Sequence, residues 1–244
     1  MAPPFRNLAA LLLALGVAGC ATNTLPSQAA LDANDPYEAQ NRQVFEFNQK
    51  LDKYVALPIA EFYVNTVPDP AREGIHNFLV NLDVPVTFAN DVLQGAADRA
   101  AQSLGQFVVN STLGIGGLVN IAPKLGIPEH ESDFGETLGV YGVNAGPYLV
   151  LPLLGPSDPR DAAGYAVDVA LDPSTWISWR SSTWFKLGRG FMKIVDERAR
   201  NIDLLNEIER TSVDVYATER SLYRQHREAE IHHGNANIEN LPNF

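Results

Sequence analysis

Apolar residues recur at helical spacing through much of the chain, beginning with Tyr37, Val44, Phe45, Leu51, Tyr54 and Val55. The start Asp35-Pro36-Tyr37-Glu38 predicts an N-cap aspartate, a proline at the first helical position and a glutamate at the third. Asp69-Pro70 and Asp158-Pro159 predict two further starts of this kind. Prolines follow at short intervals, so the pattern predicts an all-α chain of many short helices; these prolines are Pro58, Pro68, Pro85 and Pro128.

Two long stretches carry no charge. Residues 100–123 and 137–157 contain no Asp, Glu, Lys or Arg, and both are broken by glycines. A backbone broken in this way cannot face hydrocarbon with its polar groups unpaired. Each stretch can lie shallowly in one leaflet or line a cavity, and the alternative is the buried core of an ordinary helical domain. Between them, residues 128–136 hold four carboxylates and must stay in water.

The C-terminal part, from Phe191 to about His232, predicts one or two longer helices. Val195, Ala199, Ile202 and Leu205 form one stripe. The arginines and carboxylates between them are interpreted as a solvated face. We expect the tail 234–244 to be disordered. The sequence shows no strict two-residue alternation, no repeat and no transmembrane helix.

The N-terminus resembles a lipoprotein signal. Arg6 precedes a short apolar run from Leu8 to Val17, about half the length that a spanning helix needs. Small residues then lead to Cys20, the single cysteine of the chain, in an arrangement similar to the bacterial lipobox. Lipidation of Cys20 would remove a free thiol that has no partner in the chain. The alternative is an ordinary signal peptide with a chance cysteine.

These features predict four segments: a signal peptide at 1–19, a tether at 20–34, a helical domain at 35–233 and the tail at 234–244. The net charge of −11 disfavours nucleic acid and electrostatic docking on anionic lipid. Any membrane contact of the domain is therefore expected to be apolar.

Motifs for catalysis are missing from the sequence. No lysine is followed by serine or threonine, which excludes a P-loop, and no G-x-S-x-G elbow occurs. The string HESD brings His130, Ser132 and Asp133 together in sequence only. We therefore expect no enzyme activity, no cofactor and no metal site.

Long motifs identify a family resemblance that covers nearly all of the chain after Cys20. The chain resembles the MlaA/VacJ lipoproteins in DPYEAQNRQVFEFNQKLDKYVALPIA from Asp35, NSTLGIGG from Asn110, DFGETLGVYGVNAGPY from Asp133, LPLLGPSDPRD from Leu151 and SVDVYATERSLYRQHR from Ser212. The resemblance implies a helical ring in the inner leaflet of the outer membrane, lipid-anchored at the periplasmic side. Ala21, directly after the cysteine, resembles the residue at this position in outer-membrane lipoproteins, so the resemblance implies the outer membrane.

The resemblance also implies a function. A passive channel would take misplaced phospholipids from the outer leaflet and pass them to a soluble periplasmic carrier, with trimeric porins as associates. The alternatives are a structural outer-membrane tether or porin-associated scaffold without transport, and a phospholipase.

Candidate channel or gating residues lie in three regions. On the first helix they are Asn41, Arg42, Phe45, Phe47 and Asn48. Phe45 and Phe47 face different sides of a helix, so at most one lines a channel, and core packing is the alternative for both. In the two uncharged stretches the candidates are Gly114, Gly116, Gly117, Phe134, Gly139, Gly142 and Gly146. The glycines are interpreted as hinges or gates, with simple turn geometry as the alternative.

Two positions depart from the family pattern. Family members often carry arginine where this chain has Gln106, and aspartate where it has Asn120. The two changes remove charges of opposite sign. One hypothesis is that these residues pair in the family and were lost together here.

Overall fold

Helices make up most of the computed structural model, which describes residues 34–177 and 182–233. The predicted signal peptide, Cys20, almost all of the tether and the tail lie outside the described residues. The helical class is confirmed, with one small addition, a two-stranded hairpin formed by β1 (Leu149–Leu151) and β2 (Gly155–Ser157).

The helices before the hairpin are α3 (Glu38–Leu51), α4 (Leu57–Thr66), α5 (Asp69–Leu93), α6 (Ala97–Thr112) and α7 (Phe134–Val140). A π-helical segment, Asp52–Ala56, joins α3 to α4, and a 3₁₀ turn, Ala122–Leu125, follows α6. The helices after the hairpin are α8 (Pro159–Leu171), α9 (Pro173–Trp176), α10 (Ser182–Arg200), α11 (Ile202–Thr211) and α12 (Val215–Ile231).

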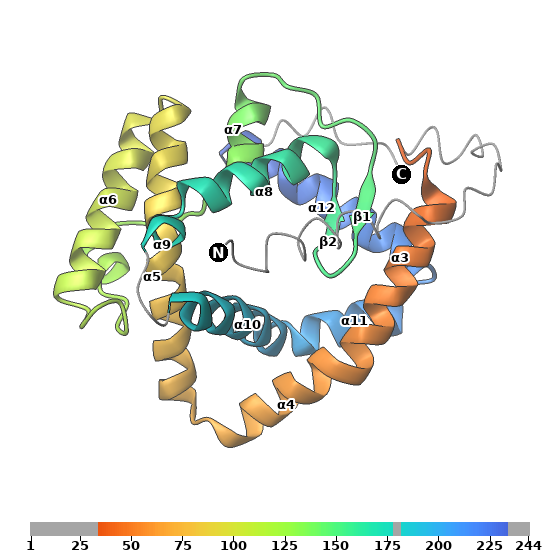
Figure 1. The fold of residues 1–244 in the computed structure, drawn as a ribbon, viewed down its shortest axis with the longest axis horizontal. Coiled ribbons are helices and arrows are strands. Elements are labelled where there is room, and N and C mark those ends of the chain that lie inside the picture. The colour runs from red at the N-terminus through yellow and green to blue at the C-terminus, as the bar shows by residue number, and fades with distance from the viewer. Residues whose placement is uncertain (1–33, 178–181, 234–244) are drawn as a thin grey trace, which may run out of the picture.

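The helices follow one another around the periphery of the view in Figure 1. α3 and α4 form one side, α5 crosses to the other side with α6 outside it, and α7, α8 and the hairpin complete the circuit, with α12 behind them. α10 and α11 run between α5 and α3. The tightest packing joins α5 to α6, α7 to α8 and α4 to α10.

The predicted helix starts have different outcomes. At Asp158 the prediction is confirmed, because its carboxylate caps α8 by accepting a hydrogen bond from the Asp161 N–H at 2.8 Å. At Asp69 it is wrong by one residue, since Pro68 occupies the N-cap. At Asp35 it is also wrong: α3 begins at Glu38, and the Asp35 carboxylate is buried in contacts with other segments.

The expectation that every proline ends a helix is wrong at Pro85. This residue lies inside the 25-residue helix α5. A proline there removes one backbone hydrogen bond, at a cost of about 3 kcal/mol. Packing of α5 against α6, with Leu79 and Val84 buried, offsets that cost.

The hairpin was missed because each strand has three residues, too few to show an alternating pattern. Its register pairs Leu149 with Ser157 and Leu151 with Gly155. Side chains of α3 hold the hairpin in place, as described below.

The interior is mostly polar. Four of the buried hydrophobic residues, Phe45, Tyr148, Val150 and Tyr216, form a compact cluster. In it Tyr216 packs edge-on against Phe45 and Tyr148 at centroid distances of 5.4 and 6.0 Å. Elsewhere the buried positions are held by hydrogen bonds and ion pairs; the fully buried or nearly buried polar residues include Asp35, Asn90, Asp91, Ser103, Gln106, Glu136, Thr137 and Asp196. In an ordinary water-soluble domain, residues of these types rarely dominate the interior.

Candidate functional site

Helix α10 exposes its apolar face. Its large apolar side chains follow one another at intervals of three or four residues and so share a face; they are Trp184, Leu187, Phe191 and Ile194, between 54% and 77% exposed. We call these four residues the apolar stripe.

The opposite face of α10 is charged and packs against the protein. Arg189 donates to Asp83 of α5 at 2.5 Å and to Asp172 at 2.6 Å, and Lys193 donates to the other oxygen of Asp83 at 2.9 Å. About two turns later, Arg200 pairs with Glu73 of α5 at 2.9 Å.

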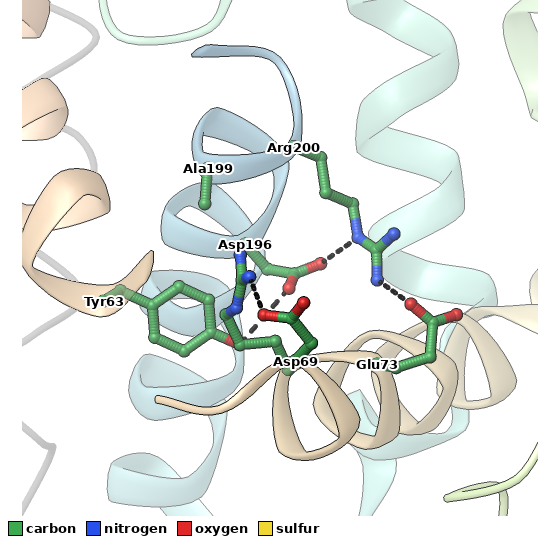
Figure 2. Close-up of a pocket in the computed structure, with 7 residues that line it drawn as sticks. Tyr63, Asp69, Glu73, Asp196, Ala199 and Arg200 are labelled. Carbon is green, nitrogen blue, oxygen red and sulfur yellow. Dashed lines mark hydrogen bonds and ion pairs between the residues drawn. The ribbon is translucent and has the colours of Figure 1, made fainter. Parts of the chain in front are cut away.

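A buried carboxylate, Asp196, joins α10 to α4 and α5. Figure 2 shows its bonds to Tyr63 of α4 and to Arg200. Asp196 accepts hydrogen bonds from His76 Nδ1 at 2.8 Å, Tyr63 OH at 3.4 Å and Arg200 Nε at 3.3 Å. Burial, with the Asp196 charge, raises the pKa of Tyr63, which keeps the phenol protonated as a donor. The pocket beside this carboxylate measures about 220 Å³ and is bounded by side chains that already pair with one another.

The polarity of α10 is thus reversed relative to a helix on a water-soluble domain, where the apolar face packs inward. Its exposed face suits an apolar medium. No helix in the described ranges is both long and apolar enough to cross a bilayer.

The uncharged stretches also expose apolar side chains, although Tyr148 and Val150 of the second stretch are buried in the aromatic cluster. In the first stretch these are Leu104, Val108, Leu113, Ile115, Leu118 and Val119, and in the second Val140, Tyr141, Val143, Leu153 and Leu154. An exposed apolar area on this scale marks an interaction surface.

A second group of side chains is exposed to solvent and yet surrounded by protein. The side chain of Lys193 is 56% exposed, and Glu131, in the loop before α7, is also exposed. Even so, desolvation raises the pKa of Glu131, and the charge of Lys193 only partly offsets this effect. Desolvation and neighbouring charges therefore both act on the pKa values of these two exposed groups.

Charges from four segments act on the pKa values of these two groups. Desolvation works against the Lys193 ammonium, but Asp83, Glu131 and Glu197 outweigh it and raise the lysine pKa. Glu230 of α12 adds to the shift of Glu131. We call the set Asp83, Glu131, Lys193, Glu197 and Glu230 the charged lining.

The polar candidates on α3 hold neighbouring segments. Asn41 donates to Asp35 Oδ1 at 2.8 Å and to the Tyr148 carbonyl at 3.0 Å, and accepts from Val150 N–H at 3.0 Å. Asn48 likewise bonds the Leu151 carbonyl and the Leu153 N–H, both at 2.9 Å. Both asparagines thus clamp the hairpin onto α3.

Two other α3 candidates, Phe45 and Phe47, lie on different sides of the helix, as helix geometry predicts. Phe45 is buried in the aromatic cluster, whereas Phe47 is 53% exposed. Arg42 forms a bidentate pair with Asp214 and lies 4.3 Å from the centre of the Tyr216 ring. The hydrogen bond from the Arg42 guanidinium lowers the pKa of Asp214, so both partners stay charged.

Among the first group of candidate glycines, Gly114 and Gly117 are required by close backbone approach. A Cβ on Gly114 would lie 2.2 Å from the Val119 carbonyl oxygen, and one on Gly117 would lie 2.7 Å from Asn81 of α5. Gly117 has φ of +93°, and Gly116 is also left-handed. This turn packs tightly on α5, which favours the turn interpretation at these positions.

The remaining candidates lie around α7. Gly139 faces Ile231 of α12, where a Cβ would come within 2.7 Å of the side chain. Gly142 and Gly146 have positive φ in the loop that leads to the hairpin. Phe134 begins α7, and its N–H donates to Asp168 of α8 at 3.1 Å.

The two positions that depart from the family pattern meet on one carboxylate. Gln106 Nε2 donates to Glu129 Oε1 at 3.4 Å, and Asn120 donates to the same oxygen. If the arginine and aspartate of the family form a pair, positions 106 and 120 must lie close together, and here both side chains reach the same carboxylate.

The HESD residues point to different partners. His130 Nε2 bonds Asp91 at 2.8 Å, Ser132 accepts from Gln94 at 2.7 Å, and Asp133 caps α7 and pairs with Arg227. They do not form a nucleophile and base in contact.

Glu136 is a buried carboxylate whose ionisation destabilises the fold. It is 1% exposed, and desolvation raises its pKa from 4.5 to about 7, against the effect of Arg99 at 3.4 Å. The folded state therefore binds the proton more tightly than the unfolded state. Stability should fall as pH rises between about 4.5 and about 7, by at most about 1.4 kcal/mol per pH unit, and level off above that range.

Glu136→Gln should remove this slope and unfold at a higher temperature than the wild type at pH 8. The amide keeps an acceptor for Arg99. Thermal unfolding of both proteins from pH 5 to pH 8 checks it, because ionisable groups that make no contact with Glu136 contribute equally to both curves and cancel in the difference. Parallel curves would contradict the assignment.

Sequence analysis did not single out the charged lining or the buried arginines of the C-terminal helices. The solvated-face interpretation is wrong for Arg227, which is buried and pairs with Asp133 at 2.7 Å and Asp161 at 2.7 Å. It is wrong for Arg198 too, whose side chain is 9% exposed and pairs with Asp52. A usable signal was present: in α10 the charges recur at the same helical spacing as the apolar residues.

Comparison with protein families gives one match, to the MlaA lipoprotein family, over residues 33–230. Among curated relatives, the Haemophilus influenzae protein named "Intermembrane phospholipid transport system lipoprotein MlaA" is 36% identical over 93% of this chain and 90% of its own length. The Escherichia coli protein of the same name is 34% identical over 95% and 92%. An uncharacterized protein of Rickettsia felis is 36% identical over 82% and 79%.

A solved structure is similar as well. It is described as "Structural basis for maintenance of bacterial outer membrane lipid asymmetry", and its chain matches with a TM-score of 0.71 and 35% identity, over 81% of this chain and 98% of that one.

Proposed function

The chain belongs to the MlaA lipoprotein family, and on that basis we propose that it is a passive conduit for phospholipids. It removes phospholipids misplaced in the outer leaflet of the outer membrane and passes them to a soluble periplasmic carrier, which maintains lipid asymmetry. The names of the relatives support transport of phospholipid between membranes, and the similar solved structure concerns outer-membrane lipid asymmetry.

The observation that carries this proposal is the opposite placement of charge and apolar surface on one helix. The apolar stripe of α10 is exposed, while the charged face of the same helix pairs with Asp83, Asp172 and Glu73 of the surrounding protein. A phospholipid needs both environments, because its headgroup cannot enter hydrocarbon without a large desolvation penalty and its tails gain nothing from water. A ring with a polar interior and an apolar exterior provides them side by side.

The domain lies in the inner leaflet of the outer membrane, lipid-anchored through Cys20. Its exposed apolar side chains support shallow insertion, and its lack of a helix able to span a bilayer in the described ranges agrees with a position in one leaflet. Trimeric porins and the periplasmic carrier are its partners. With no nucleotide motif in the sequence, direction comes from those partners or from lipid asymmetry.

Transfer between vesicles and carrier tests the proposal. Full-length lipidated protein is reconstituted in vesicles that contain deuterated phospholipid, a purified periplasmic carrier is added, and lipid bound to the carrier is measured by mass spectrometry. We expect transfer several-fold faster than from vesicles that hold an equal amount of an unrelated outer-membrane lipoprotein. Transfer no faster than that control would leave only the role of a tether or scaffold, and lysolipid products would indicate a phospholipase.

A further inference from the structure

A small cavity lies between α12, the start of α8 and the loop that leads into the hairpin. Its volume of about 120 Å³ has room for several water molecules or for one group of the size of phosphate. Its charged walls are three arginines, Arg160, Arg224 and Arg227, and two carboxylates, Asp158 and Glu228. We call it the arginine cavity.

Arg227 is committed to the fold. Its guanidinium pairs with Asp133, Asp161 and Glu230, each at 2.7 Å. This arginine therefore joins α12 to the N-cap of α7 and to α8, and forms a wall of the cavity.

Arg160 is also buried, but it has donors left over. The residue is 8% exposed, and its Nε donates to Asp161 at 2.9 Å. Its Nη2 lies 3.7 Å from Asp158, which is beyond hydrogen-bond distance. Its two terminal nitrogens make no hydrogen bond with residues 34–177 or 182–233. A buried guanidinium in this state needs an acceptor from elsewhere.

Tyr148, the residue before β1, lines the same cavity and has the same need. It is 3% exposed, and its hydroxyl has no hydrogen-bond partner in the part of the chain that the structure describes. Burial raises the pKa of this phenol, so that it stays protonated and can donate. A buried donor without an acceptor is costly, which favours a ligand that supplies one.

The two carboxylates of the cavity already have partners. Asp158 accepts from the Asp161 N–H at 2.8 Å and from the Tyr223 hydroxyl at 3.1 Å. Glu228 lies 3.0 Å from His232 Nε2. The unfilled positions around the cavity are thus donors, and arginines outnumber carboxylates in its described lining.

From these observations we infer that the arginine cavity is a binding site for a phosphate group, either on a phospholipid headgroup or as free phosphate. Arg160 comes from α8, Tyr148 from the start of the hairpin and Arg224 from α12, so the ligand has to accept from several directions. A tetrahedral oxyanion does so, and guanidinium groups bind it with paired hydrogen bonds. The inference concerns binding and does not depend on transport.

Titration calorimetry and thermal unfolding test the site. Full-length lipidated protein in a phosphate-free maltoside detergent is titrated with sodium phosphate and, separately, with glycerophosphoethanolamine, a soluble phosphodiester headgroup. We expect saturable binding, and an unfolding midpoint raised by about 5–10 °C at a ligand concentration about a hundredfold above Kd. Sodium chloride at equal ionic strength is the blank. Binding of the diester indicates a headgroup as the source, whereas binding of inorganic phosphate alone indicates free phosphate.

Tyr148→Phe separates ligand binding from folding. Because the hydroxyl has no acceptor among the described residues, its removal should leave the ligand-free unfolding midpoint unchanged or slightly higher. Affinity should fall about tenfold or more, since a hydrogen bond to a charged ligand is lost. Tyr165→Phe is the matched control, because Tyr165 is 57% exposed on α8 and lies outside the cavity lining. It should bind like the wild type.

Two results would overturn the inference. One is the absence of saturable binding of either ligand by the wild type. The other is an equal affinity and an equal midpoint shift in Tyr148→Phe, because phosphate would then act through the bulk solvent. Neither result bears on the conduit, which is judged by transfer of lipid from vesicles to the carrier.

Discussion

Asp35→Ala is expected to reduce the free energy of unfolding by about 3–5 kcal/mol, a large part of the stability of a typical domain. Asp35 is fully buried. Its carboxylate accepts from Asn41 of α3 at 2.8 Å and from Arg220 of α12 at 2.7 Å, and it also accepts from the Tyr216 hydroxyl. One side chain therefore joins the first described helix to the last.

The large effect arises from what the substitution leaves behind. Among the described residues, Arg220, whose side chain is 15% exposed, would keep one ion-pair partner, Glu38 at 4.0 Å. The buried Tyr216 hydroxyl would lose its acceptor. Burial and the Asp35 carboxylate raise the pKa of Tyr216, so the phenol stays a neutral donor that needs a partner. Removing one partner of a buried ion pair destabilises a protein more than replacing both partners with apolar residues, because the remaining charge stays buried without compensation.

Urea unfolding in a fixed detergent measures this change. Asp69→Ala is the control, because the Asp69 side chain is 89% exposed and pairs with Arg72 three residues later. It should leave the free energy of unfolding nearly unchanged. Asp35→Asn keeps an acceptor and should fall between the wild type and the alanine variant. Equal stability of the two alanine variants would contradict the role given to Asp35.

Asp35 also shows how far the sequence predicts this fold. The strings at Asp35 and Asp158 both have proline next and an acidic residue at the third position, yet only Asp158 caps its helix. Local chemistry is the same in the two places. The difference comes from Tyr216 and Arg220, about 180 residues away in sequence, which the folded chain brings to Asp35.

Pro85 and α10 are two further features that depend on tertiary packing and that local sequence does not predict. Propensity predicts a break at Pro85, and tertiary packing against α6 overrides it. The stripe predicted from periodicity, Val195, Ala199, Ile202 and Leu205, is not the exposed apolar stripe of α10 and is divided between α10 and α11. Periodicity also cannot tell which face of a helix is inside, since that depends on the surrounding medium. The family motifs supplied the function, whereas the charged lining required the positions of side chains from separate segments.

The second large effect concerns membrane insertion and follows from the outward orientation of the apolar stripe of α10. Phe191→Glu/Ile194→Glu is expected to withdraw the apolar stripe from the bilayer, because each carboxylate held within the hydrocarbon costs about 2 kcal/mol or more. Both side chains are more than half exposed, at 54% and 60%. The substitutions should therefore leave the stability of the protein in detergent nearly unchanged. A water-soluble domain with a buried stripe would instead be strongly destabilised.

Tryptophan fluorescence provides the measurement, since Trp184 belongs to the stripe and is 77% exposed. In vesicles of phospholipids brominated on the acyl chains, the wild type should be strongly quenched and the double glutamate variant much less so. Phe191→Leu/Ile194→Val keeps the stripe apolar and should be quenched like the wild type. If the glutamate variant is quenched equally, the stripe does not lie in lipid. If it unfolds in detergent, the stripe is part of a core, and the reversed polarity of α10 no longer supports a conduit within the membrane.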